Sequence, residues 1–419
     1  MKNSLKALQE KYGNVEKENV LRLIRYMKRK RLEQGKTLEN VSKGVCSPSY
    51  YSKIENGLVD VDDYYLKKLC ENLNIEYDNV KCNRDDTFFS TVVEYYLLNR
   101  FDLLDDKLKR MVNAGVYCDT ELELIILLTD ILNKNFNEAF TLITKLEDIR
   151  NILSKEELYL LAFLSTLYLF KINQFKTAAE QIEILKNNPS DNMYFNIAVW
   201  DLGADIYFCL GKESTFFRYY QGLKQFDNQE LYNNRILMHN LQCLVLYAKN
   251  GNVDVEDELD VQLLTIKNND LDENKIVFYQ GLIYYYLADY LRALDILNVA
   301  GPDYAILCLE AMVLSKINDF EKSGKYLRKI KKSAEHSDYE KLYVSYLEYM
   351  KGKFEQHSYL KMQGYLKSYV LPLGKKYGLF WLYEEEIREY LNLCFELGKY
   401  KEVVRFLIKN GDLDFLKKH

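Results

Sequence analysis

Proline and glycine are scarce in this chain. Its 419 residues include only four prolines and eighteen glycines. Proline costs about 3 kcal/mol in the interior of a helix and glycine about 1 kcal/mol, so their scarcity favours helices over most of the length. The chain is also too long for one ordinary hydrophobic core, which indicates two or three domains or an extended array of repeats.

Long hydrophobic runs are absent as well. No segment reaches the roughly 18 consecutive apolar residues that a transmembrane helix needs. The nearest candidate, residues 193–211, contains Asp201 and Asp205. The N-terminal residues are polar and charged and lack the apolar core of a signal peptide. The sequence therefore predicts a cytoplasmic protein that makes no membrane contact.

The residues that build metal and catalytic sites are few or badly spaced. The eight cysteines include no C-x-x-C pair, and the four histidines are far apart. We find no phosphate-binding glycine loop, no G-x-S-x-G and no H-E-x-x-H motif. The run from Glu384 to Glu386 is interpreted as a charge run on an exposed helix, not as an acid/base pair. The sequence thus predicts a protein that is not an enzyme, with no catalytic residue, no metal ligand, no cofactor and reduced cysteines.

Charge is distributed unevenly behind a net charge of −5. Residues 1–80 carry 15 Lys and Arg against 12 Asp and Glu, a net charge of +3, which leaves −8 for the remainder. Residues 17–57 alone carry 10 basic and 4 acidic residues. A basic segment neutralises DNA phosphates, whereas an acidic body is repelled by the same duplex. The charge pattern therefore favours nucleic-acid binding by the N-terminal part alone.

The N-terminal part begins with two helix signals. Apolar residues recur at helical spacing up to Gly35, which predicts a first helix that ends there. Thr37 then stands where a helix N-cap is expected, with an acidic residue in the following turn. The sequence therefore predicts a short second helix over residues 38–44.

A third and a fourth helix follow. Ser47 provides an N-cap and Pro48 a first-turn proline for a helix over residues 48–56, and Gly57 is suited to end it. The fourth predicted helix covers residues 61–73. Two short helices joined by a tight turn and braced on either side are the geometry that places one helix in the major groove of DNA.

Three segments carry a resemblance to a known family. Residues 31–37 (RLEQGKT), 41–42 (VS) and 52–57 (SKIENG) closely resemble the XRE/Cro-like helix-turn-helix family. The chain departs from the family pattern at Leu38, where Gln is usual, and at Ser42, where Ala is usual. The missing Gln removes a customary contact with DNA. The resemblance implies that the head binds DNA.

The same resemblance implies a contact surface around the third helix. Ser49, Tyr50 and Lys53 are predicted to contact base edges or phosphates, and Lys36 and Thr37 to meet the DNA backbone. The N-cap serine has a second interpretation, as a cap only. The full predicted set is Lys36, Thr37, Ser47, Pro48, Ser49, Tyr50, Ser52 and Lys53.

Other residues of the third helix are interpreted as structural. Tyr51 and Ile54 fall on the side expected to face the core. Glu55 is predicted to pair with Arg31 or Arg25 and not to touch DNA. These assignments leave the opposite side of the helix for the predicted DNA contacts.

A short unit recurs in the rest of the chain. A small or polar pair is followed by an aromatic residue and, three positions later, by a small residue. Aromatic positions 136 and 175 are 39 residues apart, and later ones follow at intervals of 30, 34 and 46. Tetratricopeptide repeats, which are helical hairpins, recur at about 34 residues. In this interpretation the aromatic residue packs against the hairpin and the small residue lets the second helix approach. The aromatic residues are Phe136, Phe175, Tyr290, Phe320, Phe354 and Tyr400.

The predicted fold is therefore all-α. A helix-turn-helix DNA-binding domain is expected over residues 1–78, a linker over 79–90, and a right-handed superhelical tetratricopeptide-like array for ligand sensing and dimerisation over 91–419. The segments 200–211 and 277–293 match the tetratricopeptide spacing upstream of the turn best. An irregular helical bundle is the alternative fold.

The first helices of such an array line a concave groove that suits an extended peptide. Asn and Gln fit this role because each both donates and accepts hydrogen bonds. Asp201 and Asp205 lie one turn apart and could receive a cationic group. The alternative is that these polar residues are solvated or bonded between helices. The predicted peptide contacts are Asn196, Asp201, Asp205, Asn234, Asn240, Gln242, Gln280, Tyr284 and Glu310.

The order of the two parts resembles the Rgg/Rap/NprR/PlcR/PrgX family of peptide-pheromone receptors. The resemblance implies a homodimeric quorum-sensing transcription regulator whose heads bind a palindromic operator in double-stranded DNA. It also implies that the repeats bind a short signalling peptide, which shifts the two heads and changes their affinity for paired half-sites. In some relatives the repeats instead control a protein partner such as a response regulator, which is the alternative function.

Overall fold

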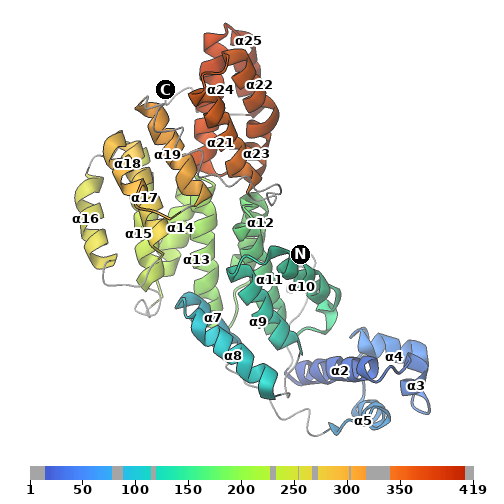
Figure 1. Cartoon of the computed structure of the whole chain (residues 1–419). Helices are drawn as coiled ribbons and strands as arrows, with labels where there is room; N and C mark the ends of the chain where they lie inside the picture. Colours follow the sequence, from blue (N-terminus) through green and yellow to red (C-terminus); the bar gives the residue numbers. More distant parts are fainter. Residues whose placement is uncertain are drawn as a thin grey trace. The chain divides into compact units, whose positions relative to one another are not determined.

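The computed structural model is helical throughout the residues it describes, and these contain no strand (Figure 1). The predicted all-α class is therefore confirmed. By contacts, the chain divides into two compact units. Unit 1 comprises residues 1–171 and 177–203, and unit 2 comprises residues 172–176 and 204–419. The described ranges are 15–77, 88–114, 119–226, 233–252, 254–266, 272–301, 303–317 and 340–410.

None of the helices in those ranges is both long enough and apolar enough to cross a bilayer.

Unit 1 begins with the head, a group of four helices. Its core is a single buried cluster to which every one of these helices contributes, including Ile24, Val41, Ile54 and Leu66, each at most 1% exposed. The first helix ends before Gly35, which has φ of +62°. The four predicted helices are all present. They are α2 (Val15–Glu33), α3 (Leu38–Ser42), α4 (Pro48–Glu55) and α5 (Asp63–Asn72).

The rest of unit 1 consists of antiparallel helix pairs. Part of the predicted 79–90 linker lies outside the described residues, and its last three residues already belong to the next helix. The helices are α7 (Phe88–Leu97), α8 (Phe101–Ala114), α9 (Asp119–Leu132), α10 (Phe136–Asp148), the 3-10 turn η1 (Arg150–Ile152), α11 (Lys155–Lys171), α12 (Phe175–Asn187) from residue 177 on, and the first part of α13 (Met193–Cys209).

Unit 2 continues the same pattern of helix pairs from the second part of α13. A π-helical segment, η4, interrupts the pairing near its end. The helices are α14 (Glu213–Lys224), α15 (Asn233–Lys249), α16 (Val255–Ile266), α17 (Glu273–Tyr286), α18 (Tyr290–Leu297), α19 (Tyr304–Lys316), α21 (Lys341–Phe354), α22 (Tyr359–Tyr365), η4 (Leu366–Val370), α23 (Leu371–Tyr377), α24 (Phe380–Glu396) and α25 (Tyr400–Asn410).

The hairpin turns share one backbone feature. A residue with positive φ lies two positions before the second helix of a pair, as at Lys134, Asn173, Gly211, Ala288 and Gly398, with φ of 60–65°. A left-handed residue ends a helix by satisfying its last carbonyls and redirecting the chain. The predicted Asn- and Gly-containing turns thus end the first helix of each pair for a stereochemical reason.

Three of the predicted repeat copies match the structure closely. Their aromatic residue begins the second helix of the pair, and the alanine three positions later is completely buried. The small side chain lets the two helices approach, as expected. The aromatic residues are Phe136, Phe175 and Tyr290, and the alanines are Ala139, Ala178 and Ala293.

Other predictions for the repeats are wrong. Phe354 is the last residue of α21 and does not begin a second helix. Tyr400 begins α25 and its ring lies 5.9 Å from that of Phe395 on α24, but the residue is 62% exposed and so is not buried in its hairpin. Glu385 and Glu386 are buried in α24, which contradicts the interpretation of this run as solvated. Phe320 lies outside the described residues.

Candidate nucleic-acid interface

Side-chain caps define the two central helices of the head. Thr37 Oγ1 accepts a hydrogen bond from the backbone N–H of Asn40 at 3.2 Å, at the start of α3. Ser47 Oγ accepts one from the N–H of Tyr50 at 3.1 Å, at the start of α4. Pro48 is the first residue of α4. These caps are the ones predicted, and they fix where each helix begins.

The two sides of α4 differ sharply. Tyr51 and Ile54 are completely buried in the head core, as predicted. Pro48, Ser49 and Lys53 are exposed on the other side, and Ser52 is half-buried beside them. The helix thus has one face fixed in the core and one face of small and basic side chains that is open to a partner.

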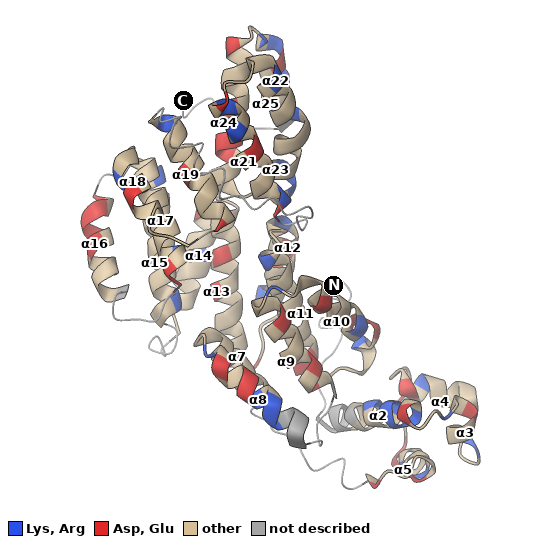
Figure 2. Cartoon of the chain, viewed as in Figure 1, with Lys and Arg blue, Asp and Glu red and all other residues tan. Residues whose placement is uncertain are grey.

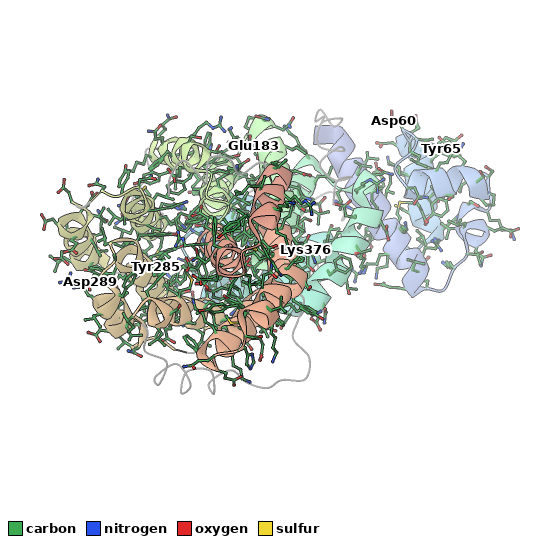
Figure 3. All side chains as sticks on the ribbon, turned by 90° about the horizontal axis from the view of Figure 1, so that it is seen from above. Asp60, Tyr65, Glu183, Tyr285, Asp289 and Lys376 are labelled. Atoms are coloured by element: carbon green, nitrogen blue, oxygen red, sulfur yellow. The ribbon has the colours of Figure 1, made fainter. Side chains whose placement is uncertain are left out.

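Tyr50 lies at the edge of this open face. It is half-buried, and its ring meets that of Tyr65 on α5 edge-on, with 6.1 Å between the ring centroids. Figure 3 labels Tyr65. Tyr65 in turn meets Tyr64 at 5.8 Å. The contact holds the Tyr50 ring beside α4 and leaves its orientation dependent on α5.

Lys36 has a structural bond within the head. Its ammonium donates to the backbone carbonyl of Asn72 at 2.8 Å. The side chain of Asn72 donates to the carbonyls of Val41 at 2.8 Å and Lys43 at 3.2 Å. Lys36, predicted to meet the DNA backbone, therefore also ties the start of α3 to the end of α5.

Helix α2 carries several Lys and Arg residues (Figure 2), and three of them pair with nearby carboxylates of the head. Arg29 and Lys30 pair with Glu33 at 2.5 and 2.9 Å. The hydrogen bonds from Lys30 and Arg29 lower the pKa of Glu33. Arg31 donates two hydrogen bonds to Glu55, at 2.7 and 3.0 Å, which confirms the predicted structural role of Glu55. The positive charge available at α4 therefore comes from its own Lys53 and from Lys28 of α2, whose ammonium donates to Asn56 at the end of α4 at 3.4 Å.

The predicted peptide contacts fall into several local settings. In unit 2, the amide of Gln242 donates to Asp205 at 2.6 Å and to the hydroxyl of Tyr279 at 2.9 Å. Its carbonyl oxygen lies 2.7 Å from His239 Nδ1. Gln242 is 1% exposed. Of the predicted set, the structure thus brings Asp205 and Gln242 into contact, in a polar cluster that joins α13, α15 and α17.

Asn240 points to a different side of α15. Its side chain accepts from the Tyr220 hydroxyl and donates to Gln262 at 3.0 Å. These partners lie on α14 and α16, whereas the partners of Gln242 lie on α13 and α17. The structure therefore separates Asn240 from Gln242, although only one residue lies between them.

The remaining predicted contacts do not join this cluster. In unit 1, Asn196 binds both the N–H and the carbonyl of Ser190, at 3.0 and 2.8 Å, and so closes the loop before α13. Asp201 is 2% exposed. In unit 2, the guanidinium of Arg292 lies over the Tyr284 ring, 5.0 Å from its centroid. Asn234 and Gln280 are half-buried, and Tyr284 and Glu310 are buried.

Two members of the polar cluster were missed by the sequence reasoning. Tyr279 is half-buried, and desolvation of its hydroxyl raises its pKa well above the usual value. Asp205, Gln242 and Tyr279 follow one another at intervals of 37 residues. They are thus the same position in successive repeats. A comparison of residues 37 positions apart in the sequence, in addition to the aromatic motif, would have identified Tyr279. No comparable signal identifies His239.

Comparisons with known proteins bear mainly on the head. Residues 27–79 match the family model described as "Helix-turn-helix". No curated protein matches the chain. A solved structure of a PrgX mutant is 12% identical, with a TM-score of 0.24, over 71% of this chain and 95% of that chain. Bacillus thuringiensis PlcR in complex with the peptide PapR7 and DNA is 14% identical, with a TM-score of 0.16, over 91% and 98%. Similarity this low carries no conclusion, whereas the match over 27–79 makes the head a helix-turn-helix domain.

Proposed function

We propose that the chain is a cytoplasmic transcription regulator that binds a palindromic operator as a homodimer and responds to a short signalling peptide bound by its repeats. The observation that carries the proposal is the open face of α4 in a helix-turn-helix domain. A helix anchored on one side and capped at its start is suited to enter a major groove N-terminus first. The two-fold symmetry of a dimer would then match a palindromic site.

The residues of α4 divide into two roles. Ser49 and Tyr50 lie in the first turn of the helix, where side chains reach base edges. Lys53 is exposed one turn later and is suited to a phosphate. Ser47 and Thr37 present helix N-termini toward the DNA backbone, where phosphates are favoured. Lys36, Pro48 and Ser52 complete the proposed surface.

For the peptide, we propose the polar residues of unit 2. Asp205 and Gln242 are held together by hydrogen bonds that a peptide backbone could replace with bonds of the same kind. Asn234, Gln280, Tyr284 and Glu310 belong to the same series of helices, α15, α17 and α19. Asn240 also belongs to α15 but bonds to α14 and α16, so we propose it as a structural residue. Asn196 and Asp201 belong to unit 1 and not to the proposed surface of unit 2, and the side chain of Asn196 is used by the loop before α13.

The first test is a selection from random duplex DNA with the full-length protein, followed by affinity measurements at several salt concentrations. We expect a two-fold symmetric motif. Lys53→Ala should weaken binding to any sequence and reduce the salt dependence by about one phosphate contact per head. Lys361→Ala, which removes an exposed lysine from unit 2, changes the net charge equally and is the matched control. Equal binding by Lys53→Ala and wild type would contradict the proposed surface.

The base contacts need a separate measurement. Ser49→Ala and Tyr50→Ala should change the sequence preference in a repeated selection, because each removes a group proposed to face bases. A loss of affinity without any change in the motif would show that these residues act only on the backbone. No enriched motif for the wild type would favour the alternative, in which the repeats control a protein partner.

The peptide proposal is tested with a library of short random peptides displayed against the full-length protein. Binding of an enriched peptide should be lost in Gln242→Leu and should change operator affinity in the wild type. Gln363→Leu is the matched control, because Gln363 is a similarly buried glutamine in unit 2 that bonds to Lys399 and Glu402. Equal loss in both variants would mean that the effect is structural.

A further inference from the structure

The core of the head is completed by a segment of the repeats. Ile152 of η1 is 2% exposed and belongs to the same buried cluster as Leu21, Ile24 and Ile54 of the head. Both segments belong to unit 1. The head is therefore packed against the first repeats and is not joined to them by the chain alone.

The end of α4 takes part in this contact. At Gly57, which follows α4, a Cβ atom would lie 2.9 Å from Ile152 Cγ2 and 3.2 Å from the carbonyl oxygen of Asn151. Gly57 also has φ of +64°, which disfavours other residues. The backbone after α4 and the segment 150–152 thus approach so closely that a side chain at Gly57 would push them apart.

A buried ion pair lies at the same contact. Arg25 of α2 is 8% exposed, and its guanidinium donates to the carboxylate of Glu157 in the first turn of α11, which is completely buried. Glu157 also accepts from the hydroxyl of Thr120 at 2.9 Å and from the N–H of Ser154 at 2.6 Å. One carboxylate therefore connects α2 of the head with the starts of α9 and α11.

The ion pair between Arg25 and Glu157 is placed where it can fix the orientation of the head relative to the first repeats. A buried charge pair loses much of its hydration, and removing one partner leaves the other charge uncompensated. Buried ionic groups are best attested as fixing one arrangement among several, whereas apolar contacts such as Ile152 tolerate sliding. The contact leaves Ser49 and Lys53 of α4 exposed. Packing of the head against the first repeats therefore fixes the direction in which the proposed DNA surface faces and leaves that surface exposed.

We infer that Arg25 and Glu157 are positioning residues that hold the recognition helix α4 at a fixed angle to the first repeats and thereby restrict the spacing of the two half-sites that a dimer accepts. This inference rests on the proposed function. One base pair of extra spacing rotates a half-site by about 34° around the duplex. If the two heads of a dimer are held rigidly, both can bind their half-sites at only a few spacings. If the heads are loosened, both can bind at many spacings.

The test uses full-length protein and a series of operators in which the spacer between half-sites changes one base pair at a time. The wild type should prefer one spacing, with affinity for the others lower by about 10²-fold or more when only one head can engage. In Glu157→Gln and Arg25→Met this difference should fall to about tenfold or less, while affinity for an isolated half-site stays unchanged. Glu33→Gln removes an exposed carboxylate that pairs with Arg29 on the same helix and should behave as wild type.

A second measurement needs no DNA. Amide hydrogen exchange of residues 149–157 should accelerate in both variants, because these residues lose the cover of the head, and exchange in α24 should not change. Faster exchange with an unaltered spacing preference would overturn the inference, as would unaltered exchange in both variants. If the wild type selects no DNA, the proposed function fails and the role in spacing falls with it, while the exchange measurement still decides whether the pair holds the head.

Discussion

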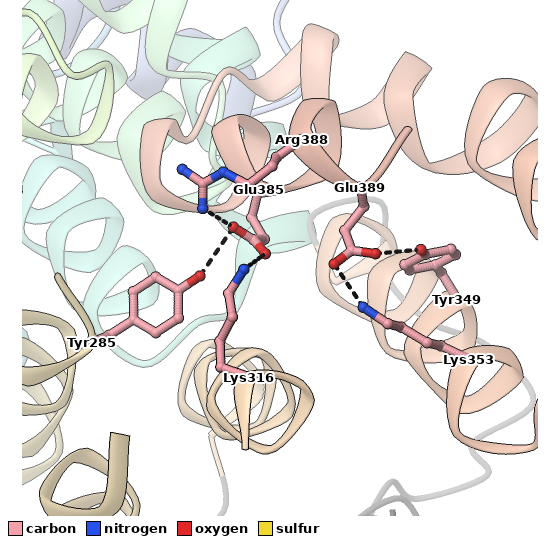
Figure 4. A network of polar contacts seen from close by, with 7 residues as sticks. All are labelled: Tyr285, Lys316, Tyr349, Lys353, Glu385, Arg388 and Glu389. Carbon is pink, nitrogen blue, oxygen red and sulfur yellow. Dashed lines mark hydrogen bonds and ion pairs between the residues drawn. The ribbon is translucent and has the colours of Figure 1, made fainter. Parts of the chain in front are cut away.

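The head and the C-terminal repeats both bury carboxylates, but they satisfy them in different ways. In the head, Glu55 has one ionic partner, Arg31, which binds it through two hydrogen bonds. In α24, Glu385 accepts from Arg388 at 2.6 Å, Lys316 at 2.9 Å and the Tyr285 hydroxyl at 3.0 Å (Figure 4). The first arrangement closes a small core, and the second joins α17, α19 and α24.

Glu389 extends the second arrangement by one turn. It accepts from the ammonium of Lys353 at 2.7 Å and from the hydroxyl of Tyr349 at 2.8 Å, both on α21 (Figure 4). Two carboxylates of α24 therefore bind side chains from three other helices. The comparison teaches that this part of the repeats is cross-linked by charge between elements distant in sequence, whereas Arg31 and Glu55 lie 24 residues apart within the head. The distant pair of the head, Arg25 with Glu157, joins it to the first repeats.

Breaking the larger network should give the largest effect. Glu385→Ala removes the carboxylate that accepts hydrogen bonds from three side chains, and it leaves two cations without their partner near a buried site. We therefore expect the free energy of unfolding of the full-length protein to fall by about 3–5 kcal/mol. Thermal and urea unfolding measure this. Glu384→Ala is the matched control, because the side chain of the neighbouring Glu384 is 37% exposed and pairs with Lys249 at 2.8 Å, one cation in place of the two that bind Glu385. Equal losses in the two variants would show that the network contributes nothing of its own.

The corresponding change in the head should cost less. Glu55→Ala removes two hydrogen bonds, but Arg31 keeps its bond to the carbonyl of Lys36 at 3.0 Å. We therefore expect a loss of about 2–3 kcal/mol, confined to the head. Hydrogen exchange of α2 and α4 compared with α24 checks this, with Glu33→Ala as an exposed control. A loss as large as that of Glu385→Ala would mean that a single pair matters as much as a network.

The same contrast explains how much the sequence could predict. The caps at Thr37 and Ser47, the end of α4 and the pair between Arg31 and Glu55 were all predicted correctly, because a short motif fixes their spacing. The hairpin turns at Asn173, Gly211 and Gly398 were also predictable, since Gly and Asn tolerate positive φ. Lys134 and Ala288 adopt the same φ without this local signal. Features that depend on a few neighbouring residues could therefore be predicted from the sequence.

The buried charges of α24 were not accessible in this way. The partners of Glu385 are 69 and 100 residues away, apart from Arg388 in the next turn. A run of three glutamates is normally solvated, and nothing nearby in the sequence indicates that helices pack on more than one side of α24. The contacts of Gln242 were missed for a related reason, because they repeat at the interval of the helix pairs and not within one motif.

Glu386 is a third buried carboxylate and contrasts with both Glu55 and Glu385, since it has no compensating cation among the described residues. It is completely buried against Gly374, where a Cβ atom would lie 1.8 Å from Glu386 Oε2. Neither carboxyl oxygen has a hydrogen-bond partner among the residues that the structure describes. Burial raises the pKa of Glu386 well above its ordinary value of 4.5, whereas Lys316 and Arg388 outweigh the effect of burial at Glu385 and hold its pKa below that value. The contributions of Glu385 and Glu386 to the stability of the fold therefore change with pH in opposite directions.

Glu386→Gln should therefore stabilise the protein modestly, the smallest effect of the three. In the wild type, the unfolded chain loses the proton near the ordinary pKa of 4.5 while the folded chain keeps it. Stability from this group consequently falls as pH rises above that value. Gln carries no proton to lose, so the melting temperature of the variant should exceed that of wild type at neutral pH, and the gain should vanish as the pH falls to about 4. Melting curves at several pH values measure the difference, with Glu384→Gln as the exposed control. A gain that does not depend on pH would mean that packing against Gly374, and not the charge of the carboxylate, is what disfavours glutamate at this position.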